Sequence, residues 1–228
     1  FNGTANYGKK VTCTISRNGD LVHKVYLQAK LGAITASTLS HLTKRIGHAL
    51  IDNVEVEIGG QRIDKHYGVW MQIWSELTHS FQKSAVLDKM TGGNTDVVTA
   101  NTSAVRTVYV PLQFWFCRNP GCALPLIALQ YHEVKLNLTF AGVAALGVGS
   151  GVADLAGDIT SASLWVDYIY LDTDERRRFA QVSHEYLIEQ LQLTGEETRS
   201  TKHKLNFNHP VKELVWVTRL TTSVAEGA

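Results

Sequence analysis

The stretch LPLIALQYHEVKL, residues 124–136, is the most informative part of the sequence. Its middle and end have the character of a β-strand, and similar segments lie on both sides of it. Residues 9–17 alternate apolar and polar side chains, with Val11, Cys13 and Ile15 on one face. Because successive side chains of a strand point to opposite faces, this alternation predicts a half-buried strand.

Two turn signals follow strand-like segments. Asn18-Gly19 tolerates positive φ, so we expect the chain to reverse there and residues 21–31 to form the returning strand. Residues 54–58 alternate valine or isoleucine with glutamate and end at Gly59-Gly60. This pattern predicts a second strand and turn, with a further strand beyond the glycines.

One segment changes from strand to helix periodicity. Between residues 67 and 77 the apolar side chains are Trp70, Ile73, Trp74 and Leu77, which is close to a helical spacing and predicts a helix. The two tryptophans lie four residues apart, so they share one face. That face belongs either to the protein core, which the pattern favours somewhat, or to an interface with another molecule.

Two segments lack a periodic apolar face. Residues 90–104 are rich in Thr, Gly, Asn and Ser, and residues 141–163 contain five glycines. Both are predicted to be long loops, which in compact domains are usually functional or disordered. Residues 105–116 lie between them and read as a strand that ends in an aromatic cluster.

The last third of the chain has further strands and a short helix. Residues 164–171 form an alternating aromatic strand, after which Asp172 and the acids behind it provide a helix N-cap and first turn. Residues 186–193 are predicted to be another strand. The polar residues 194–204 read as a linker, and residues 205–228 repeat the strand, turn, strand layout of the beginning.

Many strands, few helices and no βαβ alternation indicate an all-β protein, an antiparallel jelly-roll β-sandwich of about eight strands with short helices in its loops. We expect a first jelly-roll domain at residues 1–193, a linker at 194–204, and at 205–228 the opening hairpin of a second, truncated domain. The chain begins at Phe1 rather than methionine. We therefore expect a piece of a longer polypeptide that lacks an upstream arm.

Composition limits the classes of function. The chain has 22 basic and 21 acidic residues, a net charge of +1, without a long block of either sign. Wrapping nucleic acid directly needs a dense basic face, so that function is disfavoured. The sequence has neither a signal peptide nor an apolar run of about 20 residues. Its three cysteines lack metal-type pairing and suit free thiols in a reducing compartment.

Catalytic and metal-binding patterns are absent from the sequence. His132-Glu133 and His184-Glu185 are adjacent pairs, and neighbouring strand residues point to opposite faces, so neither pair converges on a substrate or metal. No nucleophile elbow and no phosphate-binding loop occur. We therefore predict no catalytic residues, no metal and no cofactor, and we do not expect an enzyme.

Four blocks of sequence carry a resemblance to one family: ISRNGDL at 15–21, VEVEIGGQRIDKHY at 54–67, the stretch at 124–136, and the run 165–192. With these blocks the chain resembles the major capsid proteins of large icosahedral nucleocytoplasmic DNA viruses, the algal-virus type above all. The resemblance spans most of the chain. It implies a double jelly roll of which this chain contains the first half, and a homotrimer of nearly hexagonal outline that tiles an icosahedral shell.

The resemblance also implies partners and a location. The partners are other copies of the chain, neighbouring capsomers and minor capsid proteins beneath them, with an internal membrane nearby and no direct contact with nucleic acid. The location is the outer capsid of a virion assembled in the host cytoplasm. The loops at 77–104 and 141–163 would project from one end of the sandwich and face outward.

Four residues are candidates for trimer or capsomer contacts. Trp70 and Trp74 lie on the predicted helix, and Arg118 begins a turn beside the long loops. Arg176 lies in a triple-arginine run that is either a contact for an acidic neighbour or a solvated charged face. The alternative function is a carbohydrate-binding, lectin-like jelly roll that would use loop aromatics. The loops contain few aromatics, which disfavours that alternative.

Overall fold

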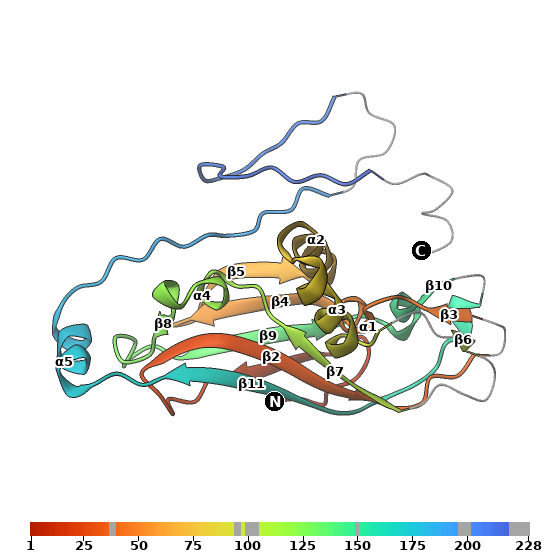
Figure 1. Ribbon diagram of the computed structural model, residues 1–228, viewed down its shortest axis with the longest axis horizontal. Coiled ribbons are helices and arrows are strands. Elements are labelled where there is room, and N and C mark those ends of the chain that lie inside the picture. Colours follow the sequence, from red (N-terminus) through yellow and green to blue (C-terminus); the bar gives the residue numbers. More distant parts are fainter. Residues whose placement is uncertain (37–39, 94–96, 99–104, 149–150, 196–201, 219–228) are drawn as a thin grey trace.

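The computed structural model describes residues 1–36, 40–93, 97–98, 105–148, 151–195 and 202–218. Two antiparallel sheets form a β-sandwich (Figure 1). The first sheet has the order β1 (Lys10–Thr14), β9 (Val134–Phe140), β4 (Ile51–Ile58), β5 (Gln61–Tyr67). The second has the order β11 (Ile159–Ile169), β2 (Leu21–Leu31), β7 (Arg106–Pro111), with β8 (Leu124–Pro125) paired to β2. This is the antiparallel sandwich that the sequence predicts.

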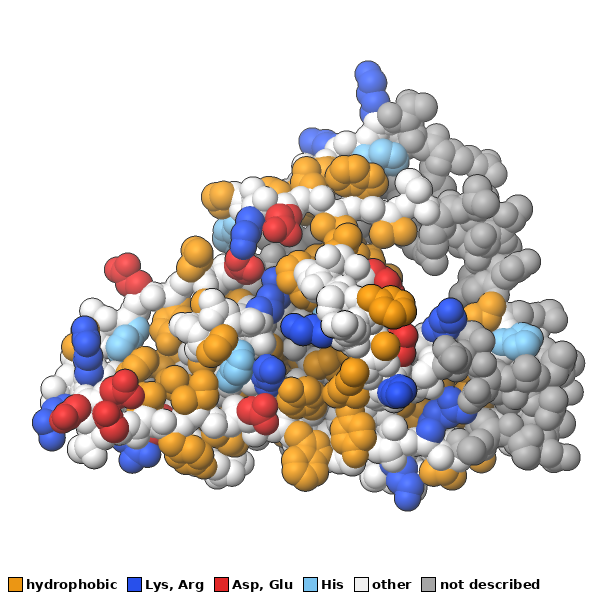
Figure 2. All heavy atoms as spheres, in the orientation of Figure 1, with side chains coloured by type: hydrophobic (Ala, Val, Ile, Leu, Met, Phe, Trp, Pro, Cys, Tyr) orange, Lys and Arg blue, Asp and Glu red, His pale blue; other side chains and the backbone are white. Residues whose placement is uncertain are grey.

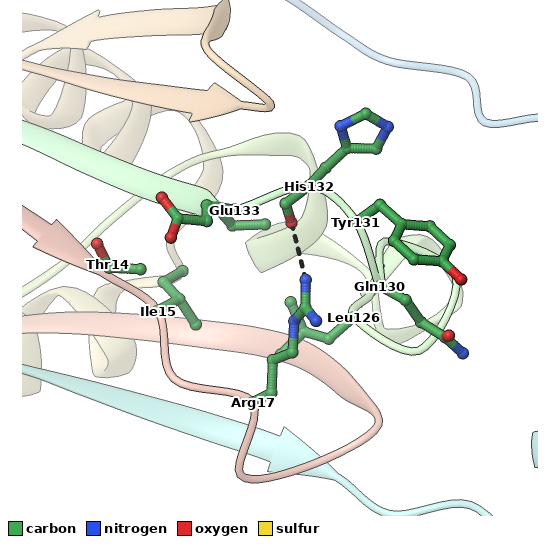
Figure 3. Close-up of a pocket in the computed structure, with 9 residues that line it drawn as sticks. Thr14, Ile15, Arg17, Leu126, Gln130, Tyr131, His132 and Glu133 are labelled. Atoms are coloured by element: carbon green, nitrogen blue, oxygen red, sulfur yellow. Dashed lines mark hydrogen bonds between the residues drawn. The ribbon is translucent and has the colours of Figure 1, made fainter.

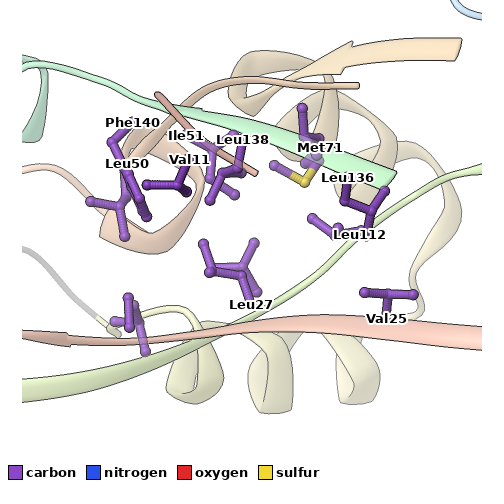
Figure 4. Packing of buried hydrophobic residues seen from close by; sticks show 14 of the residues in the cluster. Val11, Val25, Leu27, Leu50, Ile51, Met71, Leu112, Leu136, Leu138 and Phe140 are labelled. Atoms are coloured by element: carbon purple, nitrogen blue, oxygen red, sulfur yellow. The ribbon is translucent and has the colours of Figure 1, made fainter. Parts of the chain in front are cut away.

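Alternating side chains from both sheets fill the space between them. In β9, Val134, Leu136, Leu138 and Phe140 are buried, and the residues between them are partly exposed. Leu27 and Val25 from the opposite sheet point toward Leu136, Leu138 and other residues of the first sheet (Figure 4). Each such fully buried side chain contributes about 1.5–3 kcal/mol through the loss of apolar surface from water, so the core fixes which face of each strand points inward.

Short helices lie at the edges of the sandwich: α1 (Ile46–Ala49), α2 (Gly68–Thr78), α3 (Phe81–Met90), α4 (Trp115–Arg118) and α5 (Thr173–Gln181). Single 3₁₀ turns span Pro120–Cys122, Val143–Leu146 and Val152–Asp154. The predicted helices at 67–77 and after Asp172 are confirmed as α2 and α5. The carboxylate of Asp172 accepts a hydrogen bond from the Glu175 amide at 2.8 Å, which is the expected N-cap.

The two long loops meet at one end of the sandwich. There β10 (Gly147–Val148), β3 (Ser40–Leu42) and β6 (Val97–Val98) form a small three-stranded sheet. The loops are more structured than expected, because the first contains α3 and the second contains β10 and two 3₁₀ turns. Residues 94–96 and 99–104, which form most of the predicted loop at 90–104, lie outside the described residues.

Three strand predictions need correction. Residues 21–31 do form β2, but β2 pairs with β11, β7 and β8 rather than with β1. The turn after β1 therefore crosses from one sheet to the other, because each strand buries its apolar face on its own side of the core. The strand at 105–116 ends at Pro111, and the middle of 124–136 is a series of turns between β8 and β9.

The predicted strand at 186–193 is also wrong in its pairing. These residues are extended but make no ladder, since each of their hydrogen bonds to the sandwich involves at least one side chain. Among residues 202–218 the structure contains a bend at 208–209 but no strand, and residues 219–228 lie outside the described residues. The segment at 205–218 has no neighbouring strand to pair with in the described chain. The predicted domain boundaries remain a prediction.

Candidate assembly interface

Trp70 and Trp74 lie on one face of α2, with ring centroids 5.6 Å apart, and both are half-buried. The position of α2 depends on Gly68 at its first residue. A Cβ atom there would lie 2.1 Å from the carbonyl oxygen of His48 and 2.3 Å from that of Ile51, so only glycine allows this approach. The helix is thereby placed directly against the end of β5.

Arg118, the last residue of α4, reaches the same place. Its guanidinium lies 4.1 Å from the centre of the Trp74 ring and 3.3 Å from a carboxylate oxygen of Glu189. A guanidinium above an indole ring is attracted by the ring's negative face. Burial lowers the pKa of Arg118, while Glu189 raises it again, and an arginine stays charged throughout the physiological range.

Three of the four predicted contact residues therefore form one cluster, and it contacts the chain's own residues 186–191. In addition to the Arg118–Glu189 pair, Tyr186 donates its hydroxyl hydrogen to the carbonyl of Ala123 at 3.2 Å. The side chain of Gln190 donates to the carbonyl of Ile63 at 2.5 Å. We call residues 182–193 the connecting segment; it runs along the outer edge of β5 (Figure 1) and covers an edge that would otherwise be open.

Asp64, on β5, makes a further contact to the connecting segment. Its buried carboxylate accepts hydrogen bonds from the backbone amides of Lys65 at 2.8 Å and Leu191 at 3.1 Å. Burial raises the pKa of Asp64, although the two amides and Arg118 act in the opposite direction. The contact is thus polar and directional, and it fixes where residue 191 lies relative to β5.

His66 lies beside this cluster and is only 1% exposed. Its ring packs 4.3 Å from that of Phe114, and neither ring nitrogen has a hydrogen-bond partner among the described residues. Burial, with a smaller contribution from Arg118, lowers the pKa of His66 to about 3. The ring is therefore neutral at physiological pH and acts as an apolar packing residue.

Arg45 links helices α2 and α3 to each other. Its side chain, 6% exposed, donates to the hydroxyls of Ser75 on α2 and Ser84 on α3 at 2.7 and 2.6 Å. It also forms ion pairs with Glu76 at 2.9 Å and with Asp88. The roles of Arg45, Glu189 and Asp64 could not be predicted from the sequence, because no local pattern marks a side chain whose partners are distant in the chain.

Arg176 does not join the cluster. It lies on α5 and pairs with Asp20 at 2.9 Å, and the same carboxylate accepts the Leu171 amide at 2.8 Å. This contact holds α5 against the start of β2, which Asp20 immediately precedes. The structure thus divides the four candidate residues between two places.

A pocket of about 340 Å³ lies at the turns between β8 and β9 (Figure 3). Arg17 donates hydrogen bonds to the carbonyls of Leu129 at 2.7 Å and His132 at 3.2 Å, so its role there is structural. The His132 and Glu133 side chains point to different sides, as their adjacency predicts. The pocket contains no convergent pair of catalytic groups.

Two further features are absent from the described chain. There, no group of three histidine, cysteine or acidic side chains could hold a metal ion, and no helix is long and apolar enough to cross a membrane. The thiols of Cys13, Cys117 and Cys122 are free. Burial raises the pKa of Cys117 to about 12, which disfavours the nucleophilic thiolate.

Two family models cover nearly the entire chain. The model "Major capsid protein N-terminus" matches residues 1–172, and "Large eukaryotic DNA virus major capsid protein" matches residues 175–228. The junction between the two models falls at the start of α5.

Individual relatives agree with these models. A major capsid protein of Pyramimonas orientalis virus is 61% identical over 95% of this chain and 54% of its own length. That of Paramecium bursaria Chlorella virus 1 is 45% identical over 95% of this chain and 50% of its own length. The chain spans about half the length of the curated relatives it matches.

The fold agrees with solved structures. A chain of the PBCV-1 virus capsid superposes with a TM-score of 0.74 at 44% identity, covering 92% of this chain and 51% of that one. The Faustovirus major capsid protein, at 12% identity and a TM-score of 0.54, shares the fold alone. The antiparallel sandwich is therefore the jelly roll of viral major capsid proteins.

Proposed function

Since the chain belongs to the family of major capsid proteins of large eukaryotic DNA viruses, we propose that it is the first half of a subunit that forms pseudo-hexagonal trimers. These trimers tile the outer icosahedral shell of a large double-stranded DNA virus. The observation that carries the proposal is the match of the sandwich, over nearly all its length, to a chain of the PBCV-1 capsid. The role is structural rather than catalytic.

We propose two jelly-roll modules in the complete subunit, the first at residues 1–193 and the second beginning after the linker at 194–204. The relatives' greater length supports a second module. So do the exposed apolar side chains at and after the connecting segment, which need a covering surface: Leu187, Leu193, Leu205, Val211, Leu214, Trp216 and Val217. Two similar modules in each of three subunits give a six-lobed tile that packs without gaps on a flat facet.

The Trp70, Trp74 and Arg118 cluster supports trimer formation by fixing the path between the modules. Because Arg118 and Asp64 hold the connecting segment on the β5 edge, the second module starts from a defined position. Exposed apolar residues of α2 and α3, at Val69, Leu77 and Phe81, extend this region and offer contact area to another subunit. Arg176 is proposed to act at a separate contact beside α5.

The remaining partners follow from the same proposal. The end of the sandwich with β3, β6 and β10 faces outward, and the opposite end faces minor capsid proteins and an internal membrane. With a net charge of +1 the shell has no direct role in neutralising nucleic acid. Assembly takes place in the host cytoplasm.

Electron microscopy of the purified complete polypeptide tests this function. We expect class averages of single particles with threefold symmetry and a hexagonal outline. Particles without threefold symmetry, at any protein concentration, would contradict the proposal.

A further inference from the structure

The two outer faces of the sandwich differ in chemistry. On the sheet β1-β9-β4-β5, polar side chains bond to one another across strands: Thr12 donates to Asn137 at 2.8 Å, and Asn137 donates to Glu57 at 3.1 Å. Glu55 on the same face lies within 4 Å of three cationic side chains. Such a face is well solvated and has little apolar area to bury.

The outer face of β11-β2-β7 is aromatic instead. Trp165, Tyr26 and Pro111 form one cross-strand row, and Ser163, Gln28 and Tyr109 form the next. Trp165 is 59% exposed and Tyr109 is 40% exposed. Hydrophobic side chains gather over β2, β7 and β11 in Figure 2. We call these six residues the aromatic face.

Gln28 holds the aromatic face together. Its amide donates to the hydroxyl of Tyr109 at 3.0 Å and accepts from the Trp165 indole at 2.6 Å and the Ser163 hydroxyl at 3.1 Å. Because these polar groups already form hydrogen bonds to one another, removing water from the face costs little free energy. The rings are also held in place before binding, which lowers the entropy cost of docking. Sugar binding, in contrast, needs polar atoms that are free to bond the ligand.

The described part of the chain's own continuation, residues 182–195 and 202–218, does not lie over this face. The connecting segment follows β5, the edge of the first sheet opposite β1. Trp165 lies on β11, which is close to the β1 side, as the 2.6 Å hydrogen bond from Tyr168 to the carbonyl of Ser16 shows. After the connecting segment, Lys212 pairs with Glu189, so these residues also remain on the β5 side.

The edge of β11 is unsuited to pairing with an added strand. Its pairing with β2 shifts register between Ile159 and Ser161 and again between Val166 and Tyr168. Such irregularities disturb the row of backbone groups that an incoming strand must match. A partner therefore packs on the face and not on the edge.

We propose that the aromatic face is the surface on which a neighbouring copy of the complete polypeptide packs. This inference rests on the proposed function, which requires contacts between identical subunits. Two exposed lysines of β2, Lys24 and Lys30, flank the aromatic rows. Asp167 of β11 is exposed beside Tyr26, toward the Lys24 end, so the net positive end of the face is the one at Lys30. The surface that covers the face is therefore apolar in its centre and carries a carboxylate opposite Lys30.

Two variants of the complete polypeptide test the face: Trp165→Ser, which removes the most exposed ring, and Lys30→Glu, which reverses a charge at the rim. Light scattering over a dilution series gives the half-assembly concentration, the protein concentration at which half of the subunits are assembled. We expect Trp165→Ser to raise it by about tenfold or more, as for a central aromatic at an interface. Lys30→Glu should raise it by a smaller factor that shrinks with added salt. Both positions are exposed, and a thermal melt of each variant confirms that the fold persists.

The matched control is Tyr131→Ser, which removes an aromatic ring that is 94% exposed on the turns before β9. It should leave half-assembly unchanged. If Trp165→Ser assembles like the wild type, the aromatic face is not the interface. If wild-type protein binds a glycan array and only Trp165→Ser loses that binding, the face is a sugar site and the proposal is also overturned. A wild type that stays monomeric at every concentration instead refutes the proposed function itself.

Discussion

Arg118 places its guanidinium 4.1 Å from the centre of the Trp74 ring, between that ring and the carboxylate of Glu189. One cation thereby links α2, α4 and the connecting segment. The guanidinium contacts an aromatic ring on one side and a carboxylate on the other. Neither a water molecule nor an apolar side chain could make both contacts. This relationship sets where the chain leaves the sandwich.

Replacing Arg118 with alanine should release the connecting segment. We expect a loss of about 1–2 kcal/mol in the free energy of unfolding, from the cation–π contact and the partly buried ion pair. Hydrogen exchange should accelerate at the amides of residues 186–191. The control is Lys212→Ala, because Lys212 pairs with the same Glu189 but is 70% exposed and should matter little. Equal effects of the two variants would contradict this role for Arg118.

His66 should make stability depend on pH. Its folded pKa, about 3, lies below its ordinary value of 6.5, so between these values the unfolded chain binds a proton that the buried ring does not. Stability therefore falls as pH drops from 6.5 toward 3, by up to about 1.4 kcal/mol per pH unit. His66→Leu removes this dependence and leaves no unpartnered nitrogen. Urea unfolding across this range measures both slopes, and parallel slopes would refute the assignment.

Gly68→Ala should displace α2. The added Cβ would meet two backbone carbonyls at 2.1 and 2.3 Å, which a small side-chain movement cannot relieve. We expect a loss of more than about 2 kcal/mol and a changed fluorescence of Trp70 and Trp74. Gly142→Ala is the control, because nothing lies within 4 Å of a Cβ added at this position and the φ of −64° there suits alanine. Tolerance of Gly68→Ala would mean that α2 can begin elsewhere.

Arg45→Met should loosen α3 from α2. The substitution leaves Ser75 and Ser84 without their donor and removes two ion pairs, so we expect a loss of about 2–4 kcal/mol. The control is Arg177→Met, which removes an ion pair to Asp174 that is exposed on both sides. Chemical denaturation of both variants decides the matter, and a fully stable Arg45→Met would show that packing alone holds the helices.

Local signals in the sequence explain which elements could be predicted. The strands β4 and β5 and their turn follow from alternation and from two glycines, both of which adopt positive φ, 59° and 84°. The turn at Asn18-Gly19 looks the same locally, yet it joins two different sheets. Only the pairing of β1 with β9, more than a hundred residues later, determines that outcome.

The helix α3 escaped prediction because its apolar pattern is weak. Phe81 and Val86 are exposed and Leu87 is its single buried residue, so the helix depends on Arg45 and on tertiary contacts. The cluster of Trp70, Trp74 and Arg118 could likewise be predicted only in part. Spacing alone placed Trp70 and Trp74 on one face, whereas their meeting with Arg118 and Glu189 requires the folded chain.

The solution mass of the complete polypeptide, measured by light scattering after size-exclusion chromatography, tests the central claim most directly. We expect a stable trimer, three times the mass of the single chain, that persists on dilution. A monomer at all concentrations would contradict the assignment of this chain to a self-assembling capsid subunit.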